Sequence, residues 1–344
     1  MRGQRALLGV GRRLCAWGRG VSIALVLVST PAWAGSDEPQ FDDMGLQIMA
    51  RLQRAAHDLD YTGIFTFQQG QTLFSSQIAH IVDESGERQR VEVLDSPAQR
   101  EFIRHNNIVE SLVPERQMVL VDERDMDHFP GLFSGDVREL AQYYAIELDP
   151  DQGRVAGRPC RVVHVVPRDE LRWGYQLCVD LETNLLLKVQ TRNAQGDVLE
   201  QIAFSEVHIG PDAERHLLRS PHNPDGWQRI RIGEPVDLLA KGWEIGIPAG
   251  FKVVRQWRRN LKHKKNVHQV VLSDGLAAIS IFIEDWTPER GDISTTTEHG
   301  ATSVHRSRQD DFWLTVLGEV PIRTVRSVAA QTRVRPDIAQ ASAR

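Results

Sequence analysis

The chain has 344 residues, of which 41% are hydrophobic, and it carries 41 Lys and Arg against 46 Asp and Glu. At roughly 150 residues per domain, this length predicts two domains, each with an interior large enough for a hydrophobic core. The apolar fraction is too high and the net charge too small for a wholly disordered protein, and the 26 Gly and 16 Pro follow no collagen-like period. The composition therefore predicts a globular protein.

Residues 1–34 have the pattern of a secretory signal peptide. A basic segment without acids precedes the apolar run Val21–Val28, and Ala32–Ala34 supplies the small residues of a cleavage site. The alternative is a transmembrane anchor, which needs roughly 20 apolar residues and is therefore disfavoured. We expect an exported protein. The basic residues of the segment are Arg2, Arg5, Arg12, Arg13 and Arg19.

Removal of residues 1–34 changes the charge balance. Five Arg and no acid lie in that segment, so the exported chain keeps 36 basic residues against 46 acidic ones, a formal charge of −10. Binding to nucleic acid needs a basic surface. We therefore expect no nucleic-acid partner.

Two cysteines remain in the exported chain, Cys160 and Cys178. In an oxidising compartment an even number of cysteines favours a disulfide. The segments Arg158–Pro167 and Trp173–Asp180 both predict strands, and a turn centred on Asp169 places the two cysteines directly opposite each other on one face. The sequence predicts a disulfide between them, with two buried free thiols as the alternative.

Residues 35–210 predict a helix followed by a meander of short strands. Apolar residues recur at helical spacing up to residue 60, and from Tyr61 onward the period changes to two. Turn formers such as Asn106-Asn107 separate the strands, and a second helix is predicted at Asp136–Tyr144. This pattern predicts an α+β, mainly β domain: a strongly curved antiparallel sheet or half-open barrel with helices on its concave face. The helical apolar positions are Met44, Ile48, Leu52, Ala55, Ala56 and Leu59.

The remaining chain predicts a linker and a smaller domain. Residues 211–239 are rich in turn formers and have no apolar run, as expected of a linker. Residues 240–334 predict a small antiparallel sheet, in which Asp274-Gly275 between two alternating runs is a strong hairpin signal, and a helix that begins at Pro321. The polar tail, 335–344, is expected to be flexible.

A search for catalytic, metal and cofactor motifs finds none. The nucleophile elbow, the zinc-protease motif, the phosphate-binding loop and the dinucleotide fingerprint are absent from the sequence. The closest pair of the twelve His, His263 and His268, does not have metal-ligand spacing. His80 lies on an apolar strand face, so we expect it to be a hydrogen-bonded structural residue and not a ligand. We therefore expect a binding protein with no catalytic residue, metal or cofactor, rather than an enzyme.

Two sets of residues suit binding. Inward-facing positions of the meander predict a lipid cavity or, as the alternative, a packed core, because barrels form either one depending on their width. The segment Arg255–Lys265 contains six basic residues and one Trp. It predicts contact with an anionic ligand or an acidic partner, the alternative being a solvated loop. The cavity candidates are Tyr61, Phe65, Phe67, Leu73 and Phe74, and the contact candidates are Arg255, Trp257, Arg258, Arg259, Lys262, Lys264 and Lys265.

Short segments along the whole exported chain carry a family resemblance. They are Tyr61–Gln69, His80–Arg88, Phe129–Leu132, Arg154–Gly157, Val166–Tyr175, Asp180–Lys188, Gly242–Val254, Leu272–Phe282 and Gly318–Pro321. In this order they resemble the MucB/RseB family, although no single segment is diagnostic. The basic segment 255–265 and the cysteine pair match no motif of that family.

The resemblance implies a periplasmic negative regulator of the extracytoplasmic stress sigma factor of a Gram-negative bacterium. Such regulators bind the periplasmic part of a membrane-spanning anti-sigma factor, protect it from regulated proteolysis, and sense lipopolysaccharide or lipoprotein acyl chains. The large domain of the family resembles the lipoprotein carriers LolA and LolB, half-open barrels with helices in the mouth. Neither the sequence nor the resemblance decides between a monomer and a homodimer.

Two other functions remain as alternatives. A lipoprotein or lipid carrier would use the same cavity, but it does not explain a second domain attached by a linker. A periplasmic hydrolase on a β scaffold is disfavoured by the absence of catalytic motifs. In the regulator, a change in domain orientation about residues 211–239 would couple the lipid to the partner.

Overall fold

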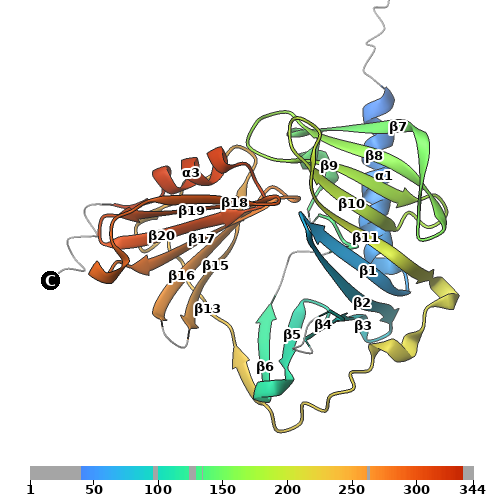
Figure 1. Cartoon of the computed structure of the whole chain (residues 1–344), viewed down its shortest axis with the longest axis horizontal. Helices are drawn as coiled ribbons and strands as arrows, with labels where there is room; N and C mark the ends of the chain where they lie inside the picture. Colours follow the sequence, from blue (N-terminus) through green and yellow to red (C-terminus); the bar gives the residue numbers. More distant parts are fainter. Residues whose placement is uncertain (1–39, 96–99, 124–128, 134, 262–263, 336–344) are drawn as a thin grey trace, which may run out of the picture. The chain divides into compact units, whose positions relative to one another are not determined.

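The computed structural model describes residues 40–95, 100–123, 129–133, 135–261 and 264–335. The described residues form one compact unit, in which the strands make a 12-stranded sheet, a 7-stranded sheet and a 2-stranded ladder (Figure 1). The predicted signal peptide, 1–34, lies outside the described residues. So does the predicted tail from residue 336 onward.

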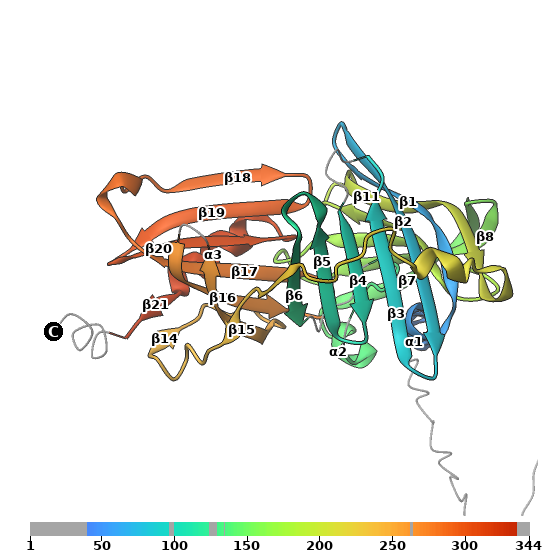
Figure 2. The same cartoon turned by 90° about the horizontal axis from the view of Figure 1, so that it is seen from below.

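The large sheet is open. Its strand order is β12-β6-β5-β4-β3-β2-β1-β11-β10-β9-β8-β7, and its two outer strands, β12 and β7, do not pair with each other. All neighbours are antiparallel except β12, which runs parallel to β6. Figure 2 shows β3, β4, β5 and β6 side by side. The predicted mainly β fold with an open, curved large sheet is confirmed. The strands are β1 (Tyr61–Gln69), β2 (Thr72–Asp83), β3 (Gly86–Val93), β4 (Glu101–His105), β5 (Ile108–Val113), β6 (Met118–Glu123), β7 (Tyr144–Val155), β8 (Arg158–Pro167), β9 (Gly174–Asp180), β10 (Leu186–Arg192), β11 (Val198–Ile209) and β12 (Gln228–Arg231).

Helix α1 (Gln40–Asp58) lies across the large sheet (Figure 1). Its predicted apolar face is largely correct, since Ile48 and Leu52 are buried in the core of that sheet. Met49, which the periodicity did not select, is fully buried, whereas Met44 is 53% exposed. The helix therefore covers the sheet with a face rotated slightly from the predicted one.

The predicted helix Asp136–Tyr144 is mostly wrong. Only Val137–Leu140 is helical (α2), with Asp136 accepting a hydrogen bond from the backbone N–H of Arg138 as its N-terminal cap. The 12-residue strand β7 then begins at Tyr144 and was missed. A register shift interrupts its pairing with β8 between Leu148 and Gln152, where Asp149, Pro150 and Asp151 resemble turn chemistry. A bulged strand thus had the composition of a loop.

The smaller sheet is antiparallel, and helix α3 (Ile322–Gln331) packs on it next to β19 and β20 (Figure 1). Its strand order is β13-β15-β16-β17-β20-β19-β18. The predicted small sheet with a C-terminal helix is confirmed. The strands are β13 (Glu234–Pro235), β15 (Lys252–Leu261), β16 (Lys264–Ser273), β17 (Ala278–Asp285), β18 (Thr295–His299), β19 (Thr302–Gln309) and β20 (Phe312–Gly318), and β14 (Trp243–Glu244) pairs with β21 (Arg333–Val334).

Each sheet has its own hydrophobic core. Helix α1, α2 and strands β7 to β11 enclose the first core, and α3 with strands β16, β17 and β20 encloses the second. The segment predicted as a linker, 211–239, pairs with both sheets, through β12 on β6 and through β13 on β15. Strands of two and four residues carry no periodicity, so the sequence could not reveal this pairing. The four 3₁₀ turns are η1 (Pro114–Arg116), η2 (Gly210–Asp212), η3 (Arg215–Leu218) and η4 (Pro288–Arg290).

Candidate functional site

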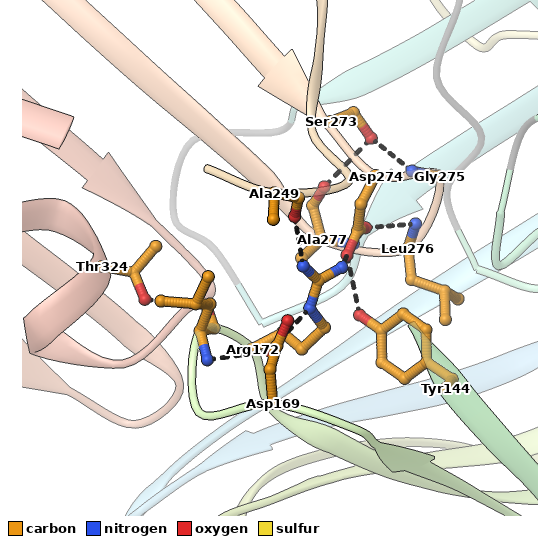
Figure 3. A network of polar contacts seen from close by, with 11 residues as sticks. Tyr144, Asp169, Arg172, Ala249, Ser273, Asp274, Gly275, Leu276, Ala277 and Thr324 are labelled. Atoms are coloured by element: carbon orange, nitrogen blue, oxygen red, sulfur yellow. Dashed lines mark hydrogen bonds and ion pairs between the residues drawn. The ribbon is translucent and has the colours of Figure 1, made fainter. Parts of the chain in front are cut away.

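The turn between β8 and β9 meets the turn between β16 and β17, and a buried arginine joins them (Figure 3). The side chain of Arg172 is 0% exposed, and it donates hydrogen bonds to Asp169 at 3.0 Å and to Asp274 at 2.7 Å. A third bond reaches the backbone carbonyl of Ala249 at 2.5 Å. Arg172 comes from the large sheet, and Asp274 and Ala249 come from the part of the chain that forms the smaller one. This network therefore connects the two sheets.

Asp274 is fully paired although its side chain is also 0% exposed. One carboxylate oxygen accepts from Arg172 and from the hydroxyl of Tyr144 at 2.9 Å. The other accepts from the backbone N–H groups of Leu276 and Ala277, at 3.0 and 2.8 Å, which fixes the Asp274-Gly275 turn. Burying two charges is costly unless they are paired and hydrogen-bonded, as they are here.

Aromatic rings surround the guanidinium group of Arg172. Its carbon lies 4.8 Å from the ring centre of Tyr143 and 5.1 Å from that of Phe251, within the range of cation–π attraction. Burial opposes the charge of Arg172, but the hydrogen bond from its guanidinium to Asp169 and the negative charge of Asp274 outweigh it and raise the pKa of Arg172. Burial raises the pKa of the Tyr144 hydroxyl well above its ordinary value. Tyr144 thus stays a neutral donor to Asp274.

Further contacts extend this connection along the two sheets. The indole N–H of Trp173 donates to the carbonyl of Ala301 at 2.8 Å. The hydroxyl of Thr324 donates to the carbonyl of Leu171, also at 2.8 Å. Around the buried pair lie more exposed ion pairs: Lys252 with Glu139, and Arg323 with Glu170. We call the residues Arg172, Asp274, Asp169 and Tyr144 the Arg172 network.

The five cavity candidates do not line one cavity. The ring of Tyr61 is buried against His80, at 4.5 Å between ring centres, and its hydroxyl donates to the carbonyl of Ala56. Phe65 packs in the core against Phe129 and Phe204. For these two residues the packed-core alternative describes the structure better.

The other three cavity candidates lie toward the β1–β2 hairpin. Phe67 pairs directly with Phe74, so both side chains lie on one face. Leu73 lies on the opposite face because successive strand residues alternate, and grouping it with Phe74 was wrong. Leu73 is 57% exposed and Phe74 is 44% exposed, while Phe67 lines a cavity between the two sheets.

The basic segment is a β-hairpin rather than a solvated loop. Arg255 and Trp257 lie on β15 with little exposed surface, and the guanidinium of Arg255 contacts Asp122 at 3.4 Å and the ring of Trp257 at 5.2 Å. Arg258, which is more exposed, forms an ion pair with Glu234. Arg255 and Trp257, two of the predicted contact residues, therefore expose little surface to an anionic ligand or an acidic partner. Arg259 also lies on β15, Lys262 lies outside the described residues, and the side chains of Lys264 and Lys265 are not described.

The two cysteines form a disulfide in the structure, with their Cα atoms 5.4 Å apart. The predicted register between their strands was wrong by two residues. Cys160 pairs with Asp180, and Cys178 pairs with Val162, so the cysteines are diagonal neighbours on one face. His80, predicted to be a hydrogen-bonded structural group, bonds to the carbonyl of Leu59 and to a carboxylate.

The sequence did not predict any residue of the Arg172 network as a site residue. Asp274 was noted only as part of a hairpin turn, and Arg172 only as one residue of a segment that carries the family resemblance. Among the described residues no group of three or more His, Cys, Asp or Glu is placed to hold a metal ion. No described helix has the length and apolar character of a membrane span. The contacts of the Arg172 network join the two sheets.

Comparison with known proteins covers most of residues 45–333. Two family models match: the MucB/RseB N-terminal domain over residues 45–222 and the MucB/RseB C-terminal domain over residues 238–333. The sigma factor AlgU regulatory protein MucB of Pseudomonas aeruginosa is 30% identical over 323 residues, which cover 91% of this chain and 95% of that protein. The sigma-E factor regulatory protein RseB of Escherichia coli is 25% identical over 287 residues, covering 82% and 88%.

Solved structures give the same result. A crystal structure of MucB in complex with MucA(peri) has a TM-score of 0.65 and 26% identity, and covers 84% of this chain and 98% of that one. The complex structure of Pseudomonas aeruginosa MucA/MucB has a TM-score of 0.68 and 27% identity, covering 85% and 99%. The similarity thus includes both sheets.

Proposed function

Because the chain belongs to the MucB/RseB family, we propose that it is a periplasmic protein that binds the periplasmic region of a membrane-spanning anti-sigma factor and protects it from regulated proteolysis. Members of this family are regulatory proteins and not enzymes. The observation that carries the proposal is the similarity over both sheets to MucB, which forms a crystalline complex with MucA(peri).

Two features of the chain support a periplasmic location. Residues 1–34 have the pattern of an export signal. The disulfide between Cys160 and Cys178 suits an oxidising compartment, since cytosolic thiols are kept reduced.

The partner is expected to contact both sheets. A segment that touches only one sheet would not require the Arg172 network, which holds the two sheets in one arrangement at the cost of burying two charges. A partner that spans both sheets binds most tightly when their arrangement is fixed, because little conformational freedom is then lost on binding. The fixed arrangement therefore favours an extended partner segment.

Binding is tested with residues 35–344 and the periplasmic segment of the anti-sigma factor from the same genome. We expect a complex with a Kd of about 1 μM or tighter by calorimetry, and slower cleavage of the anti-sigma factor by its membrane-associated protease when the complex is present. A lipoprotein extract is added as a competitor of the anti-sigma segment, because a lipoprotein carrier would bind lipoproteins instead. Failure to bind the anti-sigma segment, together with capture of lipoproteins, would support the carrier instead.

The proposal includes a lipid signal: lipopolysaccharide or lipoprotein acyl chains release the partner. Leu73 and Phe74 support it as two exposed apolar side chains near the β1–β2 hairpin, one on each face of the sheet, 57% and 44% exposed. If lipid and partner favour different arrangements of the sheets, each lowers the affinity for the other by the same factor.

We expect saturating lipopolysaccharide to weaken partner binding by roughly 5- to 150-fold, the usual range of such coupling. The double variant Leu73→Ser, Phe74→Ser should reduce this factor and leave partner binding without lipid unchanged. Ile293→Ser, which changes an apolar residue 77% exposed on the smaller-sheet part, is the matched control. An anti-sigma affinity that is the same with and without lipopolysaccharide contradicts the lipid signal.

A further inference from the structure

A cavity of about 310 Å³ lies between the two sheets, next to the Arg172 network. Strands β10 and β11 form one wall, and β17 and the end of β20 form the other. Its apolar lining includes Phe67, Leu132, Ile202 and Leu317. Such a surface suits an apolar chain of a few carbon atoms, provided that the polar groups of the cavity are also satisfied.

Two carboxyl groups face this cavity. Glu200, on β11, is 8% exposed and accepts hydrogen bonds from Gln69 at 3.3 Å and from Thr191 at 3.5 Å. Glu319 follows β20 and lies where the cavity meets solvent. In the described part of the chain, no Lys, Arg or His forms an ion pair with either group. Two acids thus share one cavity without a cation.

Burial in the cavity disfavours the charged form of both carboxyl groups. Desolvation, followed by the nearby charge of Glu200, raises the pKa of Glu319 to about 7. Burial also raises the pKa of Glu200 in spite of its hydrogen bonds. Both shifts favour the neutral carboxyl groups, and a bound cation would reverse them.

A third polar group in the cavity lacks a partner. Tyr175, on β9, is 6% exposed and lines the same cavity, and its hydroxyl forms no hydrogen bond with any described residue. A buried hydroxyl without a partner is unfavourable, so such groups in native proteins are nearly always satisfied. The hydroxyl oxygen can accept a bond from a cationic donor between the two acids. This observation, independent of the acids, points to a ligand that bonds to the Tyr175 hydroxyl.

We infer that this cavity binds a primary ammonium or guanidinium group at the end of an apolar chain, with Glu200, Glu319 and the Tyr175 hydroxyl around the cation. The source that fits best is a Lys or Arg side chain of the partner segment, so this part of the inference rests on the proposed function. The exported chain carries 46 acidic against 36 basic residues, which favours a basic segment in the partner. The apolar lining then contacts the methylene groups of that side chain.

The cavity is first tested without the partner. Hexylammonium and its neutral analogue 1-hexanol are titrated into residues 35–344 at pH 8, above the pKa of Glu319, and the side-chain resonances of the cavity are followed by NMR. We expect hexylammonium to bind at least tenfold more tightly than hexanol. Glu319→Gln should weaken hexylammonium binding by roughly 10-fold, and the double variant with Glu200→Gln by up to roughly 100-fold.

Glu115→Gln is the matched control, because it removes the same charge from an exposed position in η1 of the large-sheet part. Hexanol binding should be similar in all variants, which also shows that they are folded. No saturable shift of the cavity resonances, or equal affinities of hexylammonium for the chain and the double variant, overturns the inference.

The partner is tested second. Each Lys and Arg of the anti-sigma segment is replaced in turn by norleucine, which keeps the apolar chain and removes the charge. We expect one replacement to weaken binding roughly 10-fold in the unchanged chain and to have little effect in Glu319→Gln. Uniform small effects of all replacements contradict the partner as the source. Absence of binding by the unmodified segment instead contradicts the proposed function, and leaves the hexylammonium result to decide the cavity.

Discussion

Replacing Arg172 with leucine is expected to lower the free energy of unfolding by about 3–5 kcal/mol, because the change leaves a buried carboxylate without its cation. Asp274 would keep the hydroxyl of Tyr144 and two backbone N–H groups, but no positive charge. The measurement is urea unfolding followed by far-UV circular dichroism and by tryptophan fluorescence. Trp173, adjacent in sequence to Arg172, is bonded to Ala301 of the smaller-sheet part, so tryptophan fluorescence includes a probe at the contact between the two sheets.

The matched control is Arg323→Leu. Arg323 pairs with Glu170 across the same two parts of the chain, but these side chains are 58% and 79% exposed, and exposed pairs contribute about 0–1 kcal/mol. The double variant Arg172→Leu, Asp274→Asn should be more stable than Arg172→Leu alone, because it removes the unpaired charge. Equal, small losses in Arg172→Leu and Arg323→Leu contradict the role of the Arg172 network.

The Arg172 network also bears on the regulatory mechanism. Each sheet has its own core. In the described residues Leu276 of the smaller-sheet part packs against the first core, and polar contacts also join the sheets, of which the buried Arg172–Asp274 pair is the best shielded. Polar contacts have specific geometry and break over a short distance, whereas a continuous apolar core does not. The network thus fixes the partner-binding arrangement, and a ligand that favours an arrangement without the Arg172–Asp274 pair would release the two sheets from it.

Much of the fold could be predicted because local chemistry determines it. The Asn106-Asn107 turn was predicted between two strands, and Asn106 has the positive φ of 53° that such turns need. The family resemblance is confirmed by matches over both halves of the chain. Strand β7 was missed because its bulge contains two Asp and a Pro, so a tertiary pairing with β8 overrides the local preference.

The site was much harder to predict. Arg172 and Asp274 are 102 residues apart, and charged residues in turns are usually solvated, so nothing in their own segments indicates burial. The same holds for Glu200, a residue within strand β11, and Glu319, which directly follows a strand. These residues come together only where the two sheets pack against each other. The periodicity within one strand does not show which other strand or sheet packs against it.

Glu87 is expected to make the stability of the protein strongly dependent on pH in the acid range. Its carboxylate, on β3, accepts hydrogen bonds from His80 at 3.0 Å and His57 at 3.2 Å, with Arg104 at 3.6 Å. Burial by itself would raise the pKa of Glu87, but these hydrogen bonds and positive charges outweigh it and lower the pKa to about 2. The ordinary value is 4.5, so the folded protein binds this proton more weakly than the unfolded chain does.

This difference in pKa determines how the free energy of unfolding changes with pH. The ionised carboxylate stabilises the fold at every pH above 4.5, and the contribution is lost as the pH falls from 4.5 toward 2. A pKa lowered by this much corresponds to about 3 kcal/mol. Glu87→Gln, which cannot ionise, should lose about that amount at pH 7 and almost nothing at pH 2.

The test is a series of urea unfolding curves between pH 7 and pH 3 for the unchanged chain, Glu87→Gln and Glu84→Gln. Glu84 lies in the exposed β2–β3 turn, three residues before Glu87, and its replacement should leave the pH dependence as it is. The curves of the unchanged chain and Glu87→Gln should converge as the pH falls, because protonation then makes the two side chains alike. A constant difference between them across this range would mean that Glu87 contributes through packing and not through its charge.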